Sequence, residues 1–129
     1  MVRKGDMMSK TGKILFIEYP KCTTCQKAKK WLEENNIAFE DRHIVENNPT
    51  AAELKKWHKK SGLPIKRFVN TSGLKYRELD LKNKLADMSD AEIYALLATD
   101  GMLVKRPIIV SDEWVLTGFK PAEWEEKLK

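Results

Sequence analysis

The pattern of apolar and polar positions predicts a strand, a helix and a second strand in the first third of the chain. Residues 14–17 form a continuous apolar run of β-forming residues, which is typical of a buried strand. Residues 23–35 place their apolar side chains on one helical face and lysines and glutamates on the other. Residues 38–44 fit a second strand. Because these elements follow one another closely, they indicate a βαβ unit with parallel strands.

The middle of the chain is predicted to be helical. Residues 50–53 and 89–92 both place a Ser or Thr three positions before a Glu, which is the capping box of a helix N-terminus. They predict one helix over 51–60 and another that ends at residues 100–101. Between these helices the pattern is weak and indicates only a short helical turn at 65–69.

The last part of the chain is predicted to form a β-hairpin and a helix. Residues 108–110 and 114–116 fit two antiparallel strands, and Pro121 lies near the first position of the final helix. A βαβ half followed by a ββα half resembles the thioredoxin-like layout. We therefore expect an α/β fold with a thioredoxin-like (glutaredoxin-like) four-stranded mixed sheet. A helical insert at 49–100 would separate the two halves.

The composition fits one globular domain. The chain has 129 residues, of which 42% are hydrophobic and 33% charged. We expect residues 13–129 to form this domain and residues 1–12 to form a flexible N-terminal tail. The net charge of +5 arises from interspersed charges of both signs, so no direct nucleic-acid binding is expected.

Membrane and secretion signals are not recognisable in the sequence. No apolar run reaches the ~18 residues that a membrane span needs. The basic residues near the start are not followed by the apolar stretch of a secretory signal. We therefore expect a cytoplasmic protein without a membrane partner.

Cys22 and Cys25 are the only cysteines, and they form a Cys-x-x-Cys sequence. Two cysteines are too few for the disulfide framework of a small secreted domain. Cys22 lies between the predicted first strand and the helix that follows. The unpaired N–H groups of a first helical turn stabilise a thiolate and lower the thiol pKa. Cys22 is therefore the predicted nucleophile, and Cys25 would resolve the resulting mixed disulfide.

Metal, haem and purely structural roles are the alternatives for this cysteine pair. A structural zinc site needs about four ligands, and only His43 and His58 are available beside the cysteines, at a spacing unlike that of a zinc finger. Haem attachment needs a His directly after the second cysteine, where this chain has Gln26. Two inert buried thiols remain an alternative, which the strand-to-helix position disfavours. We expect no bound metal and no bound cofactor.

Arg106 and Pro107 form the second candidate feature. In the thioredoxin-like layout, a Pro directly before a core strand of the second half is the position of a cis-proline, and cis bonds occur almost only at Pro. Arg106 would then face Cys22, where its guanidinium could hold an oxyanion through two hydrogen bonds or stabilise the thiolate. The alternative is a surface Arg followed by a Pro that starts a strand.

Three features together resemble the arsenate reductase (ArsC)/Spx family. They are residues 19–28 (YPKCTTCQKA), the central helical insert, and residues 105–109 (KRPII). The resemblance extends over residues 13–129. It implies a thioredoxin-like fold with a helical insert and a role in thiol redox chemistry.

The family resemblance implies two different functions. Glutaredoxin-linked arsenate reductases attack arsenate with one cysteine at the position of Cys22, hold the oxyanion with three arginines, and use a glutathione adduct. Spx-type proteins bind the C-terminal domain of the RNA polymerase α subunit and use a Cys-x-x-Cys as a redox switch on transcription. Cys25 is absent from the single-cysteine reductases and resembles Spx.

The chain departs from the reductase pattern at the oxyanion site. Arg106 matches one family arginine, but the other two fall near Asn70 and Lys120. Asn70 is uncharged and Lys120 is a point charge rather than a fork. Arg67 is a further cation that could move into this site.

We expect an ArsC-family thiol redox protein, an arsenate reductase-like oxidoreductase, with glutathione or another thiol donor as co-substrate and glutaredoxin as a possible partner. The alternatives are an Spx-like regulator that binds RNA polymerase and a general glutaredoxin-like thiol–disulfide oxidoreductase. The predicted catalytic residues are Cys22, Cys25 and Arg106, and the predicted oxyanion or substrate-binding residues are Thr23, Thr24, Pro107 and Lys120.

Overall fold

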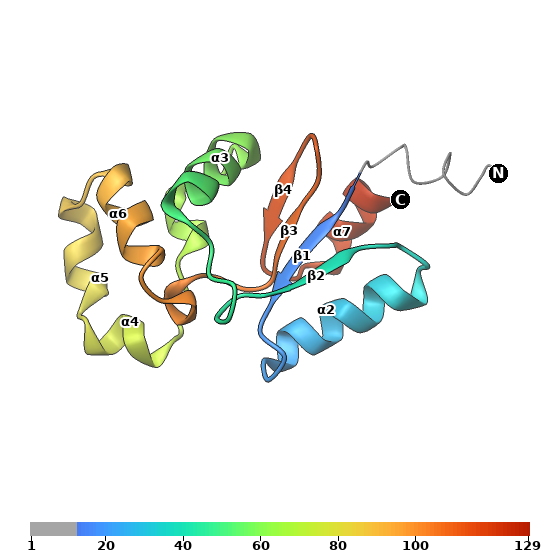
Figure 1. The fold of residues 1–129 in the computed structure, drawn as a ribbon, viewed down its shortest axis with the longest axis horizontal. Coiled ribbons are helices and arrows are strands. Elements are labelled where there is room, and N and C mark those ends of the chain that lie inside the picture. The colour runs from blue at the N-terminus through green and yellow to red at the C-terminus, as the bar shows by residue number, and fades with distance from the viewer. Residues whose placement is uncertain (1–12) are drawn as a thin grey trace.

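The computed structural model describes residues 13–129, so the tail predicted at 1–12 lies outside the described residues. Within the described part, the strands form one four-stranded mixed sheet in the order β2-β1-β3-β4 (Figure 1). β2 is parallel to β1, and β3 is antiparallel to both β1 and β4. The strands are β1 (Leu15–Glu18), β2 (Glu40–His43), β3 (Ile108–Val110) and β4 (Val115–Thr117).

Helices cover both faces of this sheet. α2 (Thr23–Glu34) and α7 (Pro121–Leu128) pack on one face. The segment between β2 and β3, called the insert below, packs on the other face and extends beyond the edge of the sheet (Figure 1). Its helices are α3 (Ala51–Ser61), α4 (Leu74–Glu78), α5 (Leu81–Lys84) and α6 (Asp90–Leu97), with the 3₁₀ helices η1 (Ile65–Phe68), η2 (Leu85–Asp87) and η3 (Gly101–Leu103).

Strand alternation divides the core into two clusters. Successive side chains of a strand point to opposite faces. Phe16 therefore packs with Leu32 of α2 and Trp124 of α7. Ile17, the next residue, packs with Leu54 and other apolar residues of the insert. All five of these apolar side chains are almost fully buried, so the central strand is held from both sides. The predicted thioredoxin-like α/β fold is confirmed.

The insert contains more helices than the sequence predicts. Both capping boxes are present, at Thr50 with Glu53 and at Ser89 with Glu92. Where only a short turn at 65–69 is predicted, the structure also contains α4, α5 and η2. Each of these is too short for a helical period to appear in the sequence. Short helices of this kind are stabilised mainly by tertiary packing, in this case by burial of residues such as Tyr76.

Three strands differ in their bounds from the prediction. The strand predicted at 14–17 is shifted by one residue to the bounds of β1. The strand predicted at 38–44 is limited to β2, an edge strand that pairs, among the described residues, only with β1. The strand predicted at 114–116 begins one residue later, because the Trp114 N–H donates to Ser111 Oγ at 3.0 Å and so belongs to the preceding turn.

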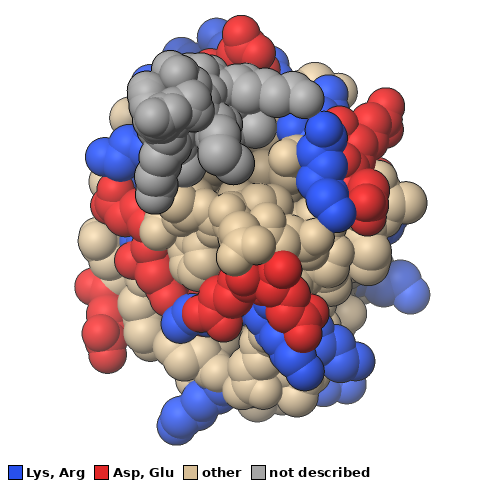
Figure 2. Space-filling model, turned by 90° about the vertical axis from the view of Figure 1, so that its right-hand side faces the viewer, with Lys and Arg blue, Asp and Glu red and all other residues tan. Residues whose placement is uncertain are grey.

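The end of the molecule opposite the insert carries charges of both signs. In its described part, basic and acidic side chains alternate around an uncharged centre (Figure 2). Neither sign dominates the visible surface, as expected from the composition. Among residues 13–129, no helix has both the length and the apolar character that a membrane crossing requires.

Candidate functional site

Cys22 lies at the N-terminus of α2, as the sequence predicts. β1 ends at Glu18, and a tight turn follows in which the Cys22 N–H donates to the Tyr19 carbonyl at 2.9 Å. The Gln26 side chain donates to the Pro20 carbonyl at 2.8 Å and closes this turn. Cys22 is the N-cap residue of α2 and its thiol is partly exposed. The unpaired N–H groups of the first helical turn therefore lie next to the sulfur.

The two cysteines have different environments. Cys25 is fully buried on the inner face of α2, and both thiols are free. Burial raises the pKa of Cys22, but hydrogen bonds from the Cys25 backbone and thiol and from Arg106 outweigh it, so the pKa lies below its usual value. Burial is the main cause that raises the pKa of Cys25 to about 12, and the neighbouring Cys22 thiol contributes to this rise. Cys22 is therefore the more readily ionised thiol.

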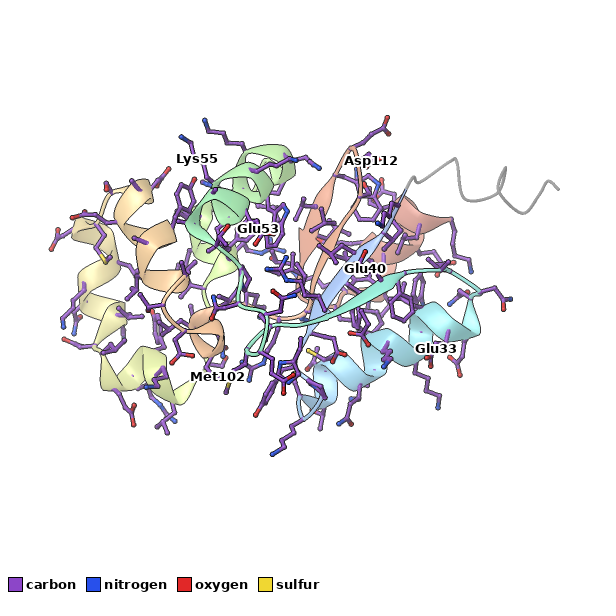
Figure 3. All side chains as sticks on the ribbon, in the orientation of Figure 1. Glu33, Glu40, Glu53, Lys55, Met102 and Asp112 are labelled. Atoms are coloured by element: carbon purple, nitrogen blue, oxygen red, sulfur yellow. The ribbon has the colours of Figure 1, made fainter. Side chains whose placement is uncertain are left out.

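Arg106 is held at the site by two contacts, and its guanidinium lowers the pKa of the Cys22 thiol. It lies over the Tyr19 ring, 5.0 Å from the ring centroid, and its Nη1 donates to Met102 Sδ at 3.7 Å. Met102 belongs to the end of the insert (Figure 3). The Arg106–Pro107 peptide bond is cis, as predicted.

Cys22 opens into a cavity of about 470 Å³ between α2, the insert and the loops that flank β3 and β4. The lining is rich in cations, because it includes two arginines and two lysines. The lining residues that matter here are Cys22, Thr24, Arg67, Asn70, Lys105, Arg106, Thr117 and Lys120.

The structure gathers most of the predicted site residues but not all of them. Cys22, Thr24, Arg106 and Lys120 line the cavity, and Cys25 is buried behind Cys22. The cavity lining includes neither Thr23 nor Pro107, so their substrate-binding role stays a prediction. Pro107 is absent from the lining because it is buried beside the sheet, where its carbonyl accepts a hydrogen bond from the Gly118 N–H at 2.8 Å. Thr23, by contrast, lies exposed on the first turn of α2.

Arg67 adds a second guanidinium to the cavity wall. The insert brings Arg67 to the cavity wall together with Asn70, one of the positions predicted for a family arginine. Lys105 also lines the cavity, although the sequence assigned it no role. The only feature of the sequence that could have indicated Lys105 is its position next to Arg106.

Thr117 is the site residue that the sequence did not indicate. It is the last residue of β4, and its side chain is 1% exposed. Among residues 13–129 its hydroxyl has no hydrogen-bond partner, and the residue lines the cavity. An unpaired buried hydroxyl costs free energy unless a ligand supplies the missing partner. Thr117 is therefore placed to donate to an anion in the cavity.

The described residues at this site do not provide a set of side chains that could bind a metal ion. Within the described residues, no group of three or more His, Cys, Asp or Glu side chains could hold a metal ion. The chemistry of the cavity is that of thiols and cations.

Comparisons with known proteins point to one family. Residues 17–127 match the model of the ArsC family. The chain is 54% identical to the uncharacterized protein YusI of Bacillus subtilis (strain 168), over 88% of this chain and 96% of YusI. It is 32% identical to the regulatory protein MgsR of the same strain, over 85% of this chain and 86% of MgsR.

A solved structure shows the same fold. A protein from Streptococcus mutans UA159, described as a possible arsenate reductase, has a TM-score of 0.82 and 40% sequence identity. The match covers 89% of this chain and 98% of that chain. Since the family match and these relatives extend over most of the chain, the protein belongs to the ArsC family.

Proposed function

We propose that this protein is a thiol-dependent reductase of the arsenate reductase type, with Cys22 as its nucleophile. The observation that carries the proposal is the arrangement of the cavity, in which the Cys22 thiol faces an anion-sized space lined by cations. The N-terminus of α2 adds the partial positive charge that favours anions at helix starts. Small oxyanions such as arsenate match this chemistry.

The cavity offers an oxyanion several donors. Arg106 provides a planar fork that can donate two hydrogen bonds to one anion. Arg67, Lys105 and Lys120 supply further positive charge, and the Thr117 hydroxyl supplies an uncharged donor. Two guanidiniums and two ammoniums thus take the place of the arginine triad expected from the family.

The reaction follows from the different acidities of the two thiols. The Cys22 thiolate attacks arsenic, and one arsenate oxygen leaves as water after taking up protons. The buried Cys25 sulfur then attacks Cys22. A Cys22–Cys25 disulfide forms, the sulfur–arsenic bond breaks, and its electron pair stays on arsenic, which leaves as arsenite. Arsenic gains two electrons and the two cysteines lose them. Glutathione, alone or through glutaredoxin, would supply the thiols that reduce this disulfide.

The test is arsenate-dependent consumption of a thiol donor. The wild-type protein should oxidise glutathione, with or without glutaredoxin, only when arsenate is present. Cys22→Ser should abolish this turnover, whereas Cys25→Ser should retain the first step and depend on external thiol for the second. No turnover with any thiol donor would contradict the proposal. Turnover of a glutathione mixed disulfide without arsenate turnover would instead favour a glutaredoxin-like oxidoreductase.

A redox-sensing regulator is the second candidate function. The observation that favours it is the 32% identity to MgsR, a regulatory protein, together with the intact cysteine pair. Oxidation of Cys22 and Cys25 would then change a binding surface rather than complete a catalytic cycle. The test is capture of the C-terminal domain of the RNA polymerase α subunit by the reduced and the oxidised protein. Absence of binding in both redox states would exclude this function.

A further inference from the structure

A buried carboxylic acid lies behind the cysteine pair and is not used by the mechanism above. Glu18 is the last residue of β1 and is 5% exposed. The Asp41 carboxyl of β2 is close enough to raise the pKa of Glu18. Asp41 Oδ2 also pairs with Lys29 Nζ of α2 at 2.9 Å. The three side chains therefore connect β1, β2 and α2.

Strand alternation places Glu18 on the face of the sheet that α2 covers. Phe16 lies two residues before Glu18, on the same face, and packs in the cluster formed with α2. Asp41 is the parallel partner of Phe16. Lys29 reaches Asp41 from α2, so this helix runs along β1 and β2 (Figure 1). The carboxyl pair lies between the sheet and the helix.

Cys25 shares this space. It lies one helical turn before Ala28, and both residues are fully buried on the inner face of α2. The negative charge of Glu18 raises the pKa of the Cys25 thiol. Glu18 is on the sheet face that α2 covers and Cys25 is on the inner face of α2, so both groups lie between the sheet and this helix.

A buried carboxyl pair at this position is costly for stability. Burying an ionised carboxylate is unfavourable, and two adjacent carboxylates repel each other. Burial, followed by the interaction with the Asp41 carboxyl and its charge, raises the pKa of Glu18 against the opposing charge of Lys29, to about 7. Near neutral pH, Glu18 therefore exists in both protonation states and can exchange a proton.

We propose that Glu18, supported by Asp41, accepts the proton of Cys25 during the resolving step, directly or across one water molecule. This rests on the function proposed above. The Cys25 sulfur attacks the Cys22 sulfur of the mixed adduct, the Cys22–Cys25 disulfide forms, and the leaving group departs with the electron pair of its broken bond to Cys22. The Cys25 proton moves to the Glu18 carboxylate, which becomes a neutral acid. The cysteines are oxidised and the leaving group is reduced.

Other titratable groups also face this site. His43 is the parallel partner of Glu18 in β2, and Asp41 belongs to the same strand. From α2, Lys29 and Cys25 face the carboxyl, and Cys22 lies at the start of the helix. The pH dependence of the resolving step must therefore be assigned by substitution rather than by its midpoint alone.

The test uses the symmetric disulfide of thionitrobenzoate as an artificial substrate. Attack by the first cysteine and resolution by the second each release one coloured thionitrobenzoate, so the two steps can be followed separately. Attack by Cys22 releases the first thiolate, and resolution by Cys25 releases the second. The rate of the second phase should rise as the pH increases through about 7, because only ionised Glu18 accepts the proton. Glu18→Gln should leave the first phase unchanged, slow the second about 100-fold at mildly alkaline pH, and remove this rise.

Matched variants show whether the Glu18 carboxylate causes the change in the second phase. Glu34→Gln removes one carboxylate from the exposed face of α2 and should change neither phase. Glu18→Asp retains a carboxylate and should restore part of the second phase. Should Glu18→Gln fail to fold, Asp41→Asn removes the neighbouring group that raises the Glu18 pKa, so the midpoint of the second phase should move to lower pH.

The outcomes distinguish this inference from the function on which it rests. A second phase with wild-type rate and pH dependence in Glu18→Gln, or an unmoved midpoint in Asp41→Asn, would overturn the role of Glu18 while leaving Cys22 as nucleophile. Absence of the first phase in the wild-type protein would instead contradict the proposed function, and with it the role of Glu18.

Discussion

Arg106 and Cys22 line the same cavity, and the Arg106 guanidinium lowers the pKa of the Cys22 thiol. Cys22 follows β1 and Arg106 precedes β3, and these strands are neighbours in the sheet. Arg106 also lies over Tyr19, which belongs to the turn that carries Cys22. The sheet thus brings a fixed cation to the helix N-terminus, where both favour the thiolate.

Substitution of Arg106 should make Cys22 less acidic. The cation stabilises the thiolate, so Arg106→Met should raise the Cys22 pKa and move the rate of iodoacetamide alkylation to higher pH. We expect alkylation at neutral pH to be several-fold slower, and Arg106→Lys to fall between the two because it retains the charge but not the fork. Arg77→Met, which removes an exposed arginine from α4, is the control. An unchanged alkylation profile in Arg106→Met would show that the guanidinium does not influence Cys22.

Thr117 should contribute to anion binding rather than to stability. Its hydroxyl has no partner within the described residues, so Thr117→Val should leave the free energy of unfolding unchanged or slightly higher. The lost donor should raise the KM for arsenate about tenfold, since a hydrogen bond to a charged acceptor has that magnitude. Thr117→Ser retains the hydroxyl and should retain the KM. A variant Thr117→Val with unchanged KM would remove Thr117 from the oxyanion site.

The ion pair of Arg42 and Glu53 should stabilise the fold except in acid. Arg42 donates to both carboxylate oxygens of Glu53, at 2.8 and 2.9 Å, which joins β2 to the start of α3. The hydrogen bond from Arg42 lowers the Glu53 pKa, burial opposes it, and the Thr50 N–H lowers it further. Glu53 projects from the start of α3 (Figure 3).

Because the folded-state pKa of Glu53 lies below the unfolded value, its stabilisation is present above the unfolded pKa and is lost as the pH falls through the folded pKa. Glu53→Gln should cost about 1–2 kcal/mol at neutral pH, a value that allows for partial solvent screening. The difference from wild type should disappear in strong acid. Urea unfolding at a series of pH values measures both quantities, and a pH-independent difference would contradict the assignment.

Glu18 should have the opposite effect on stability. Burial raises its folded-state pKa to about 7, above the unfolded value. Its contribution is therefore fully present below the unfolded pKa and is lost as the pH rises through about 7. Glu18→Gln should be more stable than the wild-type protein at alkaline pH and closer to it in mild acid. Thermal unfolding across this pH range measures the difference. Equal stability of the wild-type protein and Glu18→Gln at alkaline pH would indicate that the folded state does not raise the pKa of Glu18.

Much of the site could be recognised from local sequence. The position of Cys22 between a β-forming run and an amphipathic helix is a local pattern, and so is the Arg106–Pro107 pair before an apolar strand. The two capping boxes mark the starts of α3 and α6 correctly, because they depend on residues only three positions apart. The short helices α4 and α5 were missed, since their stability comes from contacts with distant residues.

Sequence alone determined the fold class and singled out Cys22 as the proposed nucleophile, because strand and helix periodicity and the cysteine spacing are properties of neighbouring residues. Only the tertiary structure placed Arg67 and Lys105 at the cavity, left the Thr117 hydroxyl without a partner among residues 13–129, and buried Glu18 under α2. Each of these features depends on which distant segments pack together. Burial and proximity set the acidity and charge of such groups, and neither is encoded in the spacing of residues along the chain.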